Sequence, residues 1–491
     1  MQVMLKKILQ NSFLTYLRLA AKIQLLKNRQ ATIIGITGSS GKTSTKLALQ
    51  AALGGKLNNS VKTLTGNSET GIPLDLLGLK VHDYSLLDWF AITFQIPIKL
   101  LTNWSKFEII IVEMGIDSPY EPKNMSYLLK IIRPQIGILL NISTVHAEAF
   151  DPLVPNNIKA DARTEYLKSL IAQEKGKLIT SLPPEGYAIL NLDDPHILPF
   201  INQTKAKIIG FSSQKKPVKT KIFDFLQILP EIISIKNGFC TELEYKNSKF
   251  SIQFPHHIAP RGYSSTLAAS LASALIVKKI QNENKISNHQ VHHNNQLKSS
   301  LKILIKNLEK YIQFPPSRSS LLDGINHSKI IDSSYNASPL ATLQFIHLCK
   351  DLNSNYKIAI LGDMREIGQT SIEQHKLMII EANQVFNQIF CIGLLYQKAL
   401  ESLKNNPRKL NINHIYSYQC ANHAIPDIKA IIKSKSLILV KGSQNTIFLE
   451  EIVKSLLANP SDKSLLCRQS NYWMNTKNAW FNQCQENQSN H

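Results

Sequence analysis

The stretch Thr32-Ile33-Ile34-Gly35-Ile36-Thr37-Gly38-Ser39-Ser40-Gly41-Lys42-Thr43-Ser44 decides the fold of this chain. Its first six residues are mostly β-branched and apolar, which predicts a short buried strand. A Gly/Ser loop follows, and residues 46–53 then have a composition that favours a helix. Strand, loop and helix in this order predict an α/β domain with a phosphate-binding loop between the strand and the helix.

The residue types of the loop suit a phosphate group. Glycines let backbone amides approach phosphate oxygens, and the helix N-terminus adds a partial positive charge. Lys42 can reach the β- and γ-phosphates of a nucleotide, and the Thr43 hydroxyl can bind Mg²⁺. The usual P-loop has four residues between its first glycine and the Gly-Lys pair, whereas Gly38 lies only two residues before Gly41, so this is a variant loop; the alternative is a chance turn. The predicted nucleotide-binding residues here are Thr37, Gly38, Ser39, Ser40, Gly41, Lys42, Thr43 and Ser44.

Length and composition bound the function classes. The chain has 491 residues, more than one ordinary core needs, so we expect two or three domains. The net charge of +21 fits a nucleic-acid or membrane-surface protein, or simply a Lys- and Asn-rich proteome. We favour the second interpretation and predict no nucleic-acid partner, because no dense basic block with interleaved aromatic residues is present. The six cysteines form no Cys-x-x-Cys pair, which predicts reduced thiols in a cytoplasm.

Two apolar segments bear on membrane contact. Residues 1–30 are predicted to form a basic amphipathic helix that either lies on a membrane surface or docks on the protein's own core. Residues 86–101 are apolar but contain Asp88, Gln95, Pro97 and Lys99, which makes them a poor membrane-spanning candidate. We therefore expect a cytoplasmic protein, with peripheral contact to the inner membrane face through residues 1–30 as an open possibility.

The rest of the chain divides into two α/β series. Residues 31–313 are predicted to form a central three-layer α/β domain, with a polar insertion near 281–300 whose three histidines fit a solvated surface better than a metal site. Residues 314–491 are predicted to form a C-terminal Rossmann-like α/β domain. Several expected strands end at a polar residue, and ligands bind at that edge of a parallel sheet. These strand ends are Glu113, Asn141, Asn191, Asp332, Asp363 and Lys441.

Some of these polar residues suggest specific chemistry. Glu113 and His146 follow successive strands and could hold Mg²⁺ beside the phosphates, although each could instead be an N-cap or a surface histidine. Lys175 is by default a solvated helix lysine, and Arg318 is either a cation that reaches the γ-phosphate or a surface arginine. Asp332 could accept a hydrogen bond from a ribose, with Asn336 near an adenine; a plain turn is the alternative.

Together these segments resemble the Mur ligase family of peptidoglycan synthesis. The resemblance extends from Thr32 to about Glu451, and it depends on the order and spacing of several short motifs, of which 332–339 and 361–368 are the most subgroup-specific. The matching segments are 35–43, 66–67 with 71–74, 113–115, 141–142 with 146–148, 332–339, 361–368 with His375, and 440–443.

The resemblance implies an activity and a role for each site residue. The implied reaction is ATP-dependent, ADP-forming addition of D-alanyl-D-alanine to UDP-muramoyl-tripeptide through an acyl phosphate, by a monomer. ATP and Mg²⁺ would be the cofactors, and Lys175 matches the carbamylated lysine of the family. The implied catalytic residues are Lys42, His146, Lys175 and Arg318; the implied metal ligands are Thr43, Glu113, His146 and Lys175; Arg318, Asp332 and Asn336 would contact the nucleotide.

The chain also departs from the family pattern. About thirty residues precede the loop, too few for the N-terminal domain that binds the UDP-sugar in this family. Ser265, Lys177 and Gln444 replace residue types that the family usually has at these positions. The alternatives are therefore a related ligase with a lipid-linked or non-peptidoglycan carboxylate acceptor, a P-loop kinase or ATPase, and a non-catalytic scaffold.

Overall fold

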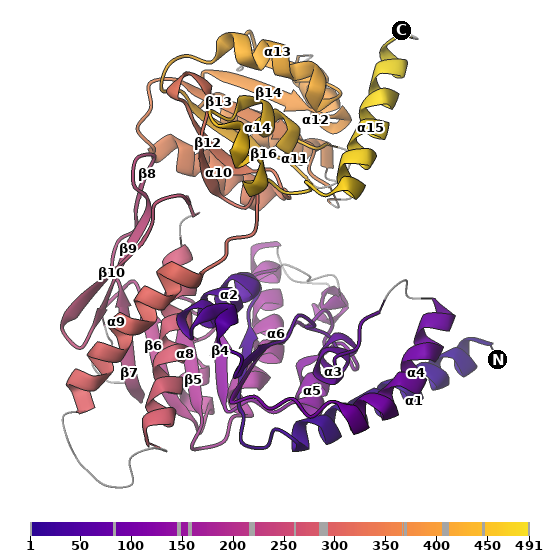
Figure 1. The fold of residues 1–491 in the computed structure, drawn as a ribbon, viewed down its shortest axis with the longest axis vertical. Coiled ribbons are helices and arrows are strands. Elements are labelled where there is room, and N and C mark those ends of the chain that lie inside the picture. Colours follow the sequence, from indigo (N-terminus) through magenta and orange to yellow (C-terminus); the bar gives the residue numbers. More distant parts are fainter. Residues whose placement is uncertain are drawn as a thin grey trace. The chain divides into compact units, whose positions relative to one another are not determined.

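The structure of the chain is a computed structural model, shown in Figure 1. It describes residues 2–81, 85–144, 149–155, 160–215, 221–259, 262–283, 293–365, 367, 371–404, 412–443 and 447–489. The described chain divides into two compact units. The first comprises residues 1–230, 241–252 and 264–313, and the second comprises residues 231–240, 253–263 and 314–491.

The elements of the first unit follow the predicted strand–loop–helix order. Its helices are α1 (Gln2–Leu26), α2 (Lys42–Ala52), α3 (Gly71–Leu77), α4 (Leu86–Thr102), α5 (Met125–Ile131), α6 (Ala160–Thr180), α7 (Phe200–Gln203), α8 (Tyr263–Glu283) and α9 (His293–Tyr311). Its strands are β1 (Thr32–Thr37), β2 (Val61–Thr63), β3 (Ile109–Glu113), β4 (Ile136–Leu139), β5 (Tyr187–Asn191), β6 (Lys207–Ser212) and β7 (Ile222–Ile228). Strand β8 (Ile232–Ser234) belongs to the second unit, and β9 (Gly238–Tyr245) and β10 (Ser248–Phe254) each have residues in both units.

These strands form one sheet with the order β10-β9-β7-β6-β5-β4-β1-β3-β2, in which β8 pairs with β9. From β2 to β7 every pair is parallel, and β7 pairs antiparallel with β9. Within 213–250, β8 and β9 are therefore antiparallel strands, whereas β7 continues the parallel sheet. Because Ile36 pairs with Glu113 and Thr37 with Leu139, the carboxyl ends of β1, β3 and β4 lie side by side.

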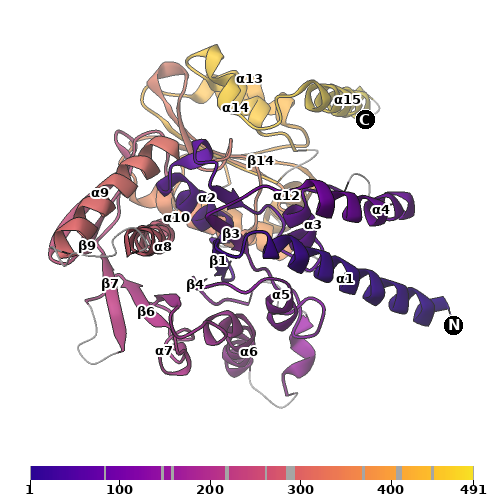
Figure 2. The ribbon, with the colours of Figure 1, turned by 60° about the horizontal axis from the view of Figure 1, so that its bottom comes forward.

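Helices cover both faces of this sheet, which confirms the predicted three-layer fold. On one face, Ile33 and Val112 share a buried cluster with Leu128 of α5 and Ile171 of α6. Figure 2 shows α2, α8 and α9 on the opposite face. There the buried Ser270 hydroxyl of α8 donates to the backbone oxygen of Thr45 in α2. The loop between β1 and α2 is therefore held between a filled core and a packed helix layer.

The amphipathic helix predicted near the N-terminus is α1, and it docks on the protein's own core. Leu14 and Leu17 are buried and pack with α3, α4 and α5. Its opposite face still carries exposed apolar side chains, including Leu19 and Ile23. In the part of the chain that the structure describes, no helix is both long enough and apolar enough to cross a membrane.

The second unit contains the predicted Rossmann-like series. Its strands are β11 (Ser320–Asp323), β12 (Lys329–Ser333), β13 (Lys357–Gly362), β14 (Gln388–Ile392), β15 (Ile415–Tyr418) and β16 (Leu437–Lys441). Their order is β11-β12-β16-β13-β14-β15, and only the β11–β12 pair is antiparallel. The helices are α10 (Pro339–Asp351), α11 (Ser371–Asn383), α12 (Leu394–Lys404), α13 (Ala421–Ile431), α14 (Glu450–Leu456) and α15 (Asn471–Ser489).

Side chains that alternate between the two faces of the strands form two hydrophobic cores, one on each side of the sheet. Ala359 and Leu361 of β13 pack with α10, α11 and α12, whereas Ile358 and Ile360 pack with α13 and α14. Successive strand residues point to opposite faces, so this apolar run fills both sides of the sheet. The sequence predicted β12, β13, β14 and β16 from such runs, but it missed β15, whose residues Ile415–Tyr418 include three polar-tipped side chains.

One prediction about the cysteines is wrong. Cys420, at the start of α13, forms a disulfide with Cys484 of α15, with 6.5 Å between their Cα atoms. Sixty-four residues separate the two cysteines, so a local motif such as Cys-x-x-Cys gives no sign that they pair. The other four cysteines are free, as expected.

A buried ion cluster holds the end of the second unit in place. The carboxylate of Glu450 is fully buried and accepts hydrogen bonds from the Arg468 guanidinium at 2.7 and 2.8 Å. The Lys477 ammonium lies 3.0 Å from the same carboxylate and is itself almost fully buried. Two buried cations therefore share the Glu450 carboxylate, and Lys477 also pairs with Glu451 at 2.7 Å.

Glu450→Ala is expected to lower the free energy of unfolding by about 3–5 kcal/mol, because it leaves the buried Arg468 guanidinium without its carboxylate partner. Urea denaturation followed by circular dichroism measures this loss. Glu373→Ala is the matched control, since Glu373 forms an exposed pair with Lys376 and contributes little. A similar stability for both variants would contradict a structural role for the Glu450 cluster.

Candidate functional site

The loop after β1 has the backbone of an anion cradle. Gly38 and Gly41 have φ angles of 154° and 81°, and Gly41 caps the N-terminus of α2. The Gly41 conformation is left-handed, which side chains other than glycine rarely adopt. The first amides of a helix have no partner within the helix, so those of α2 are directed at the loop. An anion placed there would meet both the backbone donors and the positive end of the helix.

Lys42 lies folded over this loop. Its ammonium group donates to the backbone oxygens of Gly38 at 2.8 Å and Ser39 at 3.4 Å. Burial lowers the pKa of Lys42, while the carboxylates of Glu113 and Asp117 act in the opposite direction. A phosphate bound in the cradle would be a better partner for this cation than neutral carbonyl groups.

The structure brings Thr43 and Glu113 together, as a shared metal site requires. The Thr43 hydroxyl donates to Glu113 Oε2 at 3.2 Å, and Glu113 is buried at the end of β3. The other carboxylate oxygen lies 2.5 Å from the Lys46 ammonium, which also donates to the backbone oxygen of Leu64. Sequence reasoning missed Lys46, although it lies one helical turn after Lys42 and therefore on the same side of α2.

Asn141 is a second residue that sequence reasoning left without a role at the loop. Its side-chain oxygen accepts hydrogen bonds from the Ser40 amide at 2.9 Å and the Ser40 hydroxyl at 3.2 Å. Its backbone oxygen accepts from the Ser39 amide, and the Ser39 hydroxyl exchanges hydrogen bonds with Ser143. Thr37 is tied to the next strand through the backbone oxygen of Met114. The end of β4 therefore fixes the loop from one side.

Lys175 of α6 is buried rather than solvated, so the default expectation for a helix lysine is wrong. Its side chain is about 4% exposed. Burial, together with the neighbouring Lys42, lowers its pKa to about 7, while Asp117 acts in the opposite direction. A lysine with this pKa is in large part an uncharged amine at neutral pH, which makes it a nucleophile.

The other predicted residues of the first unit are placed less fully. Ser44 lies in the first turn of α2. His146 lies outside the described residues, as do residues 284–292 of the 281–300 insertion, with His289 and His292. Among the residues that the structure does describe, no group of three or more His, Cys, Asp and Glu side chains is arranged to hold a metal ion. Thr43 and Glu113 are thus the predicted metal ligands that the structure places within contact of each other.

The second unit holds the predicted nucleotide contacts at the carboxyl ends of β12 and β16. Asp332 is fully buried and accepts hydrogen bonds from the Ser334 amide and hydroxyl at 3.0 and 2.7 Å. Burial raises its pKa, and the hydroxyls of Ser334 and Ser317 act in the opposite direction. Asp332 therefore shapes the turn that follows β12, which fits the plain-turn alternative.

Exposed groups follow this turn. The Arg318 guanidinium lies 4.3 Å from the centre of the Tyr335 ring, and both Arg318 and Asn336 are exposed. Lys441 donates to the backbone oxygen of Asn336, and burial lowers the pKa of Lys441 to about 7. These contacts leave a flat aromatic ring, an amide and a guanidinium near one another on the surface.

Arg468 supports the same turn and was missed by sequence reasoning. Its guanidinium donates to the backbone oxygens of Ser334 at 3.0 Å and Tyr335 at 3.3 Å while it binds Glu450. No local pattern in the sequence links residues 133 positions apart, so only the fold reveals this contact.

The 361–368 motif has a structural role in its described part. Asp363 accepts hydrogen bonds from the amides of Leu395 and Tyr396, and so caps α12. His375 accepts from the Met364 amide at 2.9 Å, which leaves its other ring nitrogen to donate to the backbone oxygen of Ser371. Burial lowers the pKa of His375, consistent with a neutral ring.

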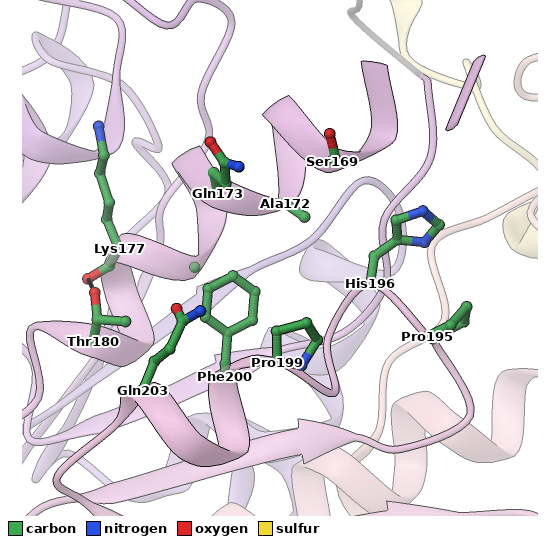
Figure 3. A pocket seen from close by; sticks show the side chains of 11 residues that line it. Ser169, Ala172, Gln173, Lys177, Thr180, Pro195, His196, Pro199, Phe200 and Gln203 are labelled. Carbon is green, nitrogen blue, oxygen red and sulfur yellow. Dashed lines mark hydrogen bonds between the residues drawn. The ribbon is translucent and has the colours of Figure 1, made fainter. Parts of the chain in front are cut away.

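A cavity of about 440 Å³ lies elsewhere in the first unit, between α6 and α7. Figure 3 shows Gln173, Phe200 and Gln203 around it. None of the predicted site residues lines this cavity, so it is separate from the loop site.

Comparisons with known proteins bear on the whole chain. The family model of the Mur ligase middle domain matches residues 36–255. The UDP-N-acetylmuramoyl-tripeptide–D-alanyl-D-alanine ligase of Buchnera aphidicola from Acyrthosiphon pisum is 26% identical over 445 residues, which cover 89% of this chain and 79% of the relative. The enzyme of the same name from Escherichia coli is 21% identical over 87% of this chain and 77% of its own.

Solved structures share the fold. The MurF ligase of Thermotoga maritima, solved in complex with ADP, matches with a TM-score of 0.60 and 20% identity, over 90% of this chain and 83% of the other. MurF from Acinetobacter baumannii gives the same TM-score at 19% identity, over 90% and 79% of the two chains. The match to the middle-domain model, the relatives along most of the length and the shared fold agree with the motifs. Residues 36–255 therefore match the Mur ligase middle domain, and most of the chain is similar to ligases that contain this domain.

Proposed function

We propose that this chain is an ATP-dependent, ADP-forming ligase that adds D-alanyl-D-alanine to UDP-N-acetylmuramoyl-tripeptide. The observation that carries the proposal is the cluster of Lys42, Thr43 and Glu113 at the edge of a parallel sheet. The relatives named for this reaction align with 89 to 91% of the chain at 26% identity, which extends the proposal from phosphate chemistry to these substrates.

The proposed reaction has two balanced steps. A carboxylate oxygen of the tripeptide attacks the γ-phosphorus of ATP, the bond to the β-phosphate oxygen breaks, and ADP leaves. The amine of D-alanyl-D-alanine then attacks the resulting acyl phosphate, phosphate leaves with the bonding electrons, and the nitrogen loses a proton. The loop amides and Lys42 would stabilise the charge on the transferring group, as donors fixed before the reaction do.

The donor set at the loop fits a magnesium ion. Hydroxyl and carboxylate oxygens are the ligands that Mg²⁺ accepts, and Thr43 and Glu113 present one of each within 3.2 Å. When bound, Mg²⁺ supplies positive charge beside the β- and γ-phosphates. His146 belongs to the same proposed set through the family resemblance.

Lys175 would enter this set as a carbamate. Its uncharged amine can attack carbon dioxide, which forms an N–C bond, and loss of one proton from nitrogen leaves a carbamate anion where a charged lysine would be a cation. Lys42 disfavours the charged form of Lys175, and a carbamate beside Lys42 would remove that repulsion.

The second unit would contribute the nucleotide contacts. Asn336 and the Tyr335 ring would face the base, and Arg318 would reach a phosphate, because all three groups gather beside one turn. Asp332 would shape that turn, and its side chain would act on the ribose only indirectly. Since all proposed contacts come from one chain and the substrates are cytoplasmic nucleotides, we place the enzyme in the cytoplasm as a monomer.

The decisive experiment measures ADP release and product mass with UDP-muramoyl-tripeptide, D-alanyl-D-alanine and ATP, with each omitted in turn. We expect a pentapeptide product and ADP release only when all three are present. Phosphate release without an amine acceptor would contradict the ligase assignment. ADP release that requires a different carboxylate acceptor would retain the ligase chemistry and overturn the proposed substrate.

A further inference from the structure

Helix α4 presents a continuous row of large apolar side chains to solvent. These residues are Leu87, Phe90, Phe94, Ile98 and Leu101, which are 59 to 81% exposed. At 100° per residue they fall within an arc of about 80°, along about 21 Å of the helix. Scattered exposed apolar residues are ordinary, but an aligned row of five marks an interaction surface. We call this row the α4 face.

The α4 face is not needed to hold α4 in place. The opposite side of the helix buries Ile92 and Ile96 against α1 and α3. The Trp89 ring contacts Phe13 of α1 edge-on at 5.3 Å between centroids, and the Tyr16 hydroxyl donates to the backbone oxygen of Thr93. These contacts fix one side of the helix and leave the outward side without a role in the fold.

Helix α1 extends the same surface. The two helices run side by side in the same direction, since Tyr16 contacts Thr93 and Gln24 donates to the backbone oxygen of Asn103 (Figure 2). On α1, Leu19, Ile23 and Leu26 are exposed and are spaced at three and four residues, as on one helix face. The paired helices thus present two apolar rows rather than one.

The charge around these rows has one sign. The chain contains no acidic residue before Glu69, and the segment 85–107 contains only Asp88. The basic residues of the segments 1–30 and 85–107 are Lys6, Lys7, Arg18, Lys22, Lys27, Arg29, Lys99 and Lys106. Such a basic, apolar surface complements an anionic lipid headgroup layer, which attracts cations and accepts apolar side chains beneath them.

An aromatic residue marks the edge of the surface. The exposed Trp104 ring follows the end of α4, and the Lys27 ammonium lies 4.4 Å from its centre. Its ring nitrogen donates to the backbone oxygen of Leu101, which holds the ring at the helix end. Tryptophan beside lysine is the pairing that favours the boundary between headgroups and acyl chains.

We propose that the α4 face and the outward side of α1 form a surface that lies flat on an anionic lipid bilayer. No described helix can cross a membrane, so the contact is peripheral. The apolar rows would enter the headgroup–acyl boundary, while the basic side chains would stay among the headgroups. The inference is independent of the proposed reaction, because none of these residues belongs to the loop site.

The test is co-sedimentation of the full chain with vesicles of phosphatidylcholine alone or with one third phosphatidylglycerol. We expect binding to the anionic vesicles and little to the neutral ones. Phe90→Ser/Phe94→Ser should weaken binding to anionic vesicles at least about tenfold, because two aromatic side chains lose their burial. Ile303→Ser/Leu465→Ser, which removes two exposed apolar residues elsewhere, should leave binding unchanged.

Tryptophan fluorescence separates insertion from simple charge attraction, and analytical ultracentrifugation tests for self-association. Tryptophan fluorescence should shift to shorter wavelength on binding, and Trp104→Phe should remove most of that shift. Binding that is absent, or that is equal in wild type and Phe90→Ser/Phe94→Ser, would overturn the proposal. So would a wild-type dimer in analytical ultracentrifugation that dissociates in this variant, because the face would then bind a second copy of the chain.

Discussion

Lys42→Met is expected to slow ADP formation about 10²–10³-fold, because it removes a side-chain cation that lies folded over the loop. We expect the loop to remain folded, because the hydrogen bonds of Lys42 go to backbone oxygens of the loop. Burial also disfavours the charged form of Lys42, so the charge itself adds little stability. A coupled assay of ADP release measures the effect, with melting temperature measured alongside.

Lys56→Met is the matched control for this variant. Lys56 is exposed and lies just beyond α2, so the same change of charge and shape should leave turnover unaltered. If the two variants lost activity equally, or if Lys42→Met kept full activity, the loop would not be the site of phosphoryl transfer.

Lys175→Met is expected to lower activity about as strongly as Lys42→Met. Unlike most changes in an active site, it should also stabilise the fold near neutral pH. The folded-state pKa of Lys175 is about 7 against 10.5 for the free side chain, so between these pH values the unfolded chain binds more protons. The wild-type protein therefore gains stability as the pH rises from about 7 to 10.5, and the cost of charging Lys175 is fully present below pH 7.

Urea denaturation in carbonate-free buffer at several pH values tests this expectation. At pH 6 the methionine variant should be more stable than wild type by about 3–5 kcal/mol, and the difference should shrink as the pH rises. Carbamylation is tested separately by carbon-13 NMR with labelled bicarbonate, where wild type should give a carbamate signal that Lys175→Met lacks. If the difference in unfolding free energy between wild type and Lys175→Met did not change with pH, charging Lys175 in the folded state would carry no cost.

The sequence predicted those parts of the site that depend on neighbouring residues. The strand before Gly38, the helix after Lys42 and the polar strand end at Glu113 all follow from local patterns, and each is present. The polar edge was also predictable, because the carboxyl ends of parallel strands lie together.

The parts that were missed depend on contacts between distant segments. Asn141 binds Ser40 across about a hundred residues, and Arg468 supports the turn at Ser334 from the far end of the chain. Lys175 was expected in solvent because its neighbours in sequence are charged, whereas packing of α6 buries it. Helix periodicity shows which residues share a face, but it does not show whether another layer will cover that face.

The salt bridge between Lys46 and Glu113 has a consequence for how the enzyme is loaded. The ammonium group acts as a resident counterion, so the carboxylate at the end of β3 never stands uncompensated in the interior, whether or not a divalent ion is bound. Lys46 also has a second anchor at the Leu64 carbonyl, on which it can remain if a metal takes its place beside the carboxylate. Metal entry would then be an exchange of one cation for another. In the proposed reaction the divalent ion takes part in the chemistry, whereas the architecture of the site is complete without it.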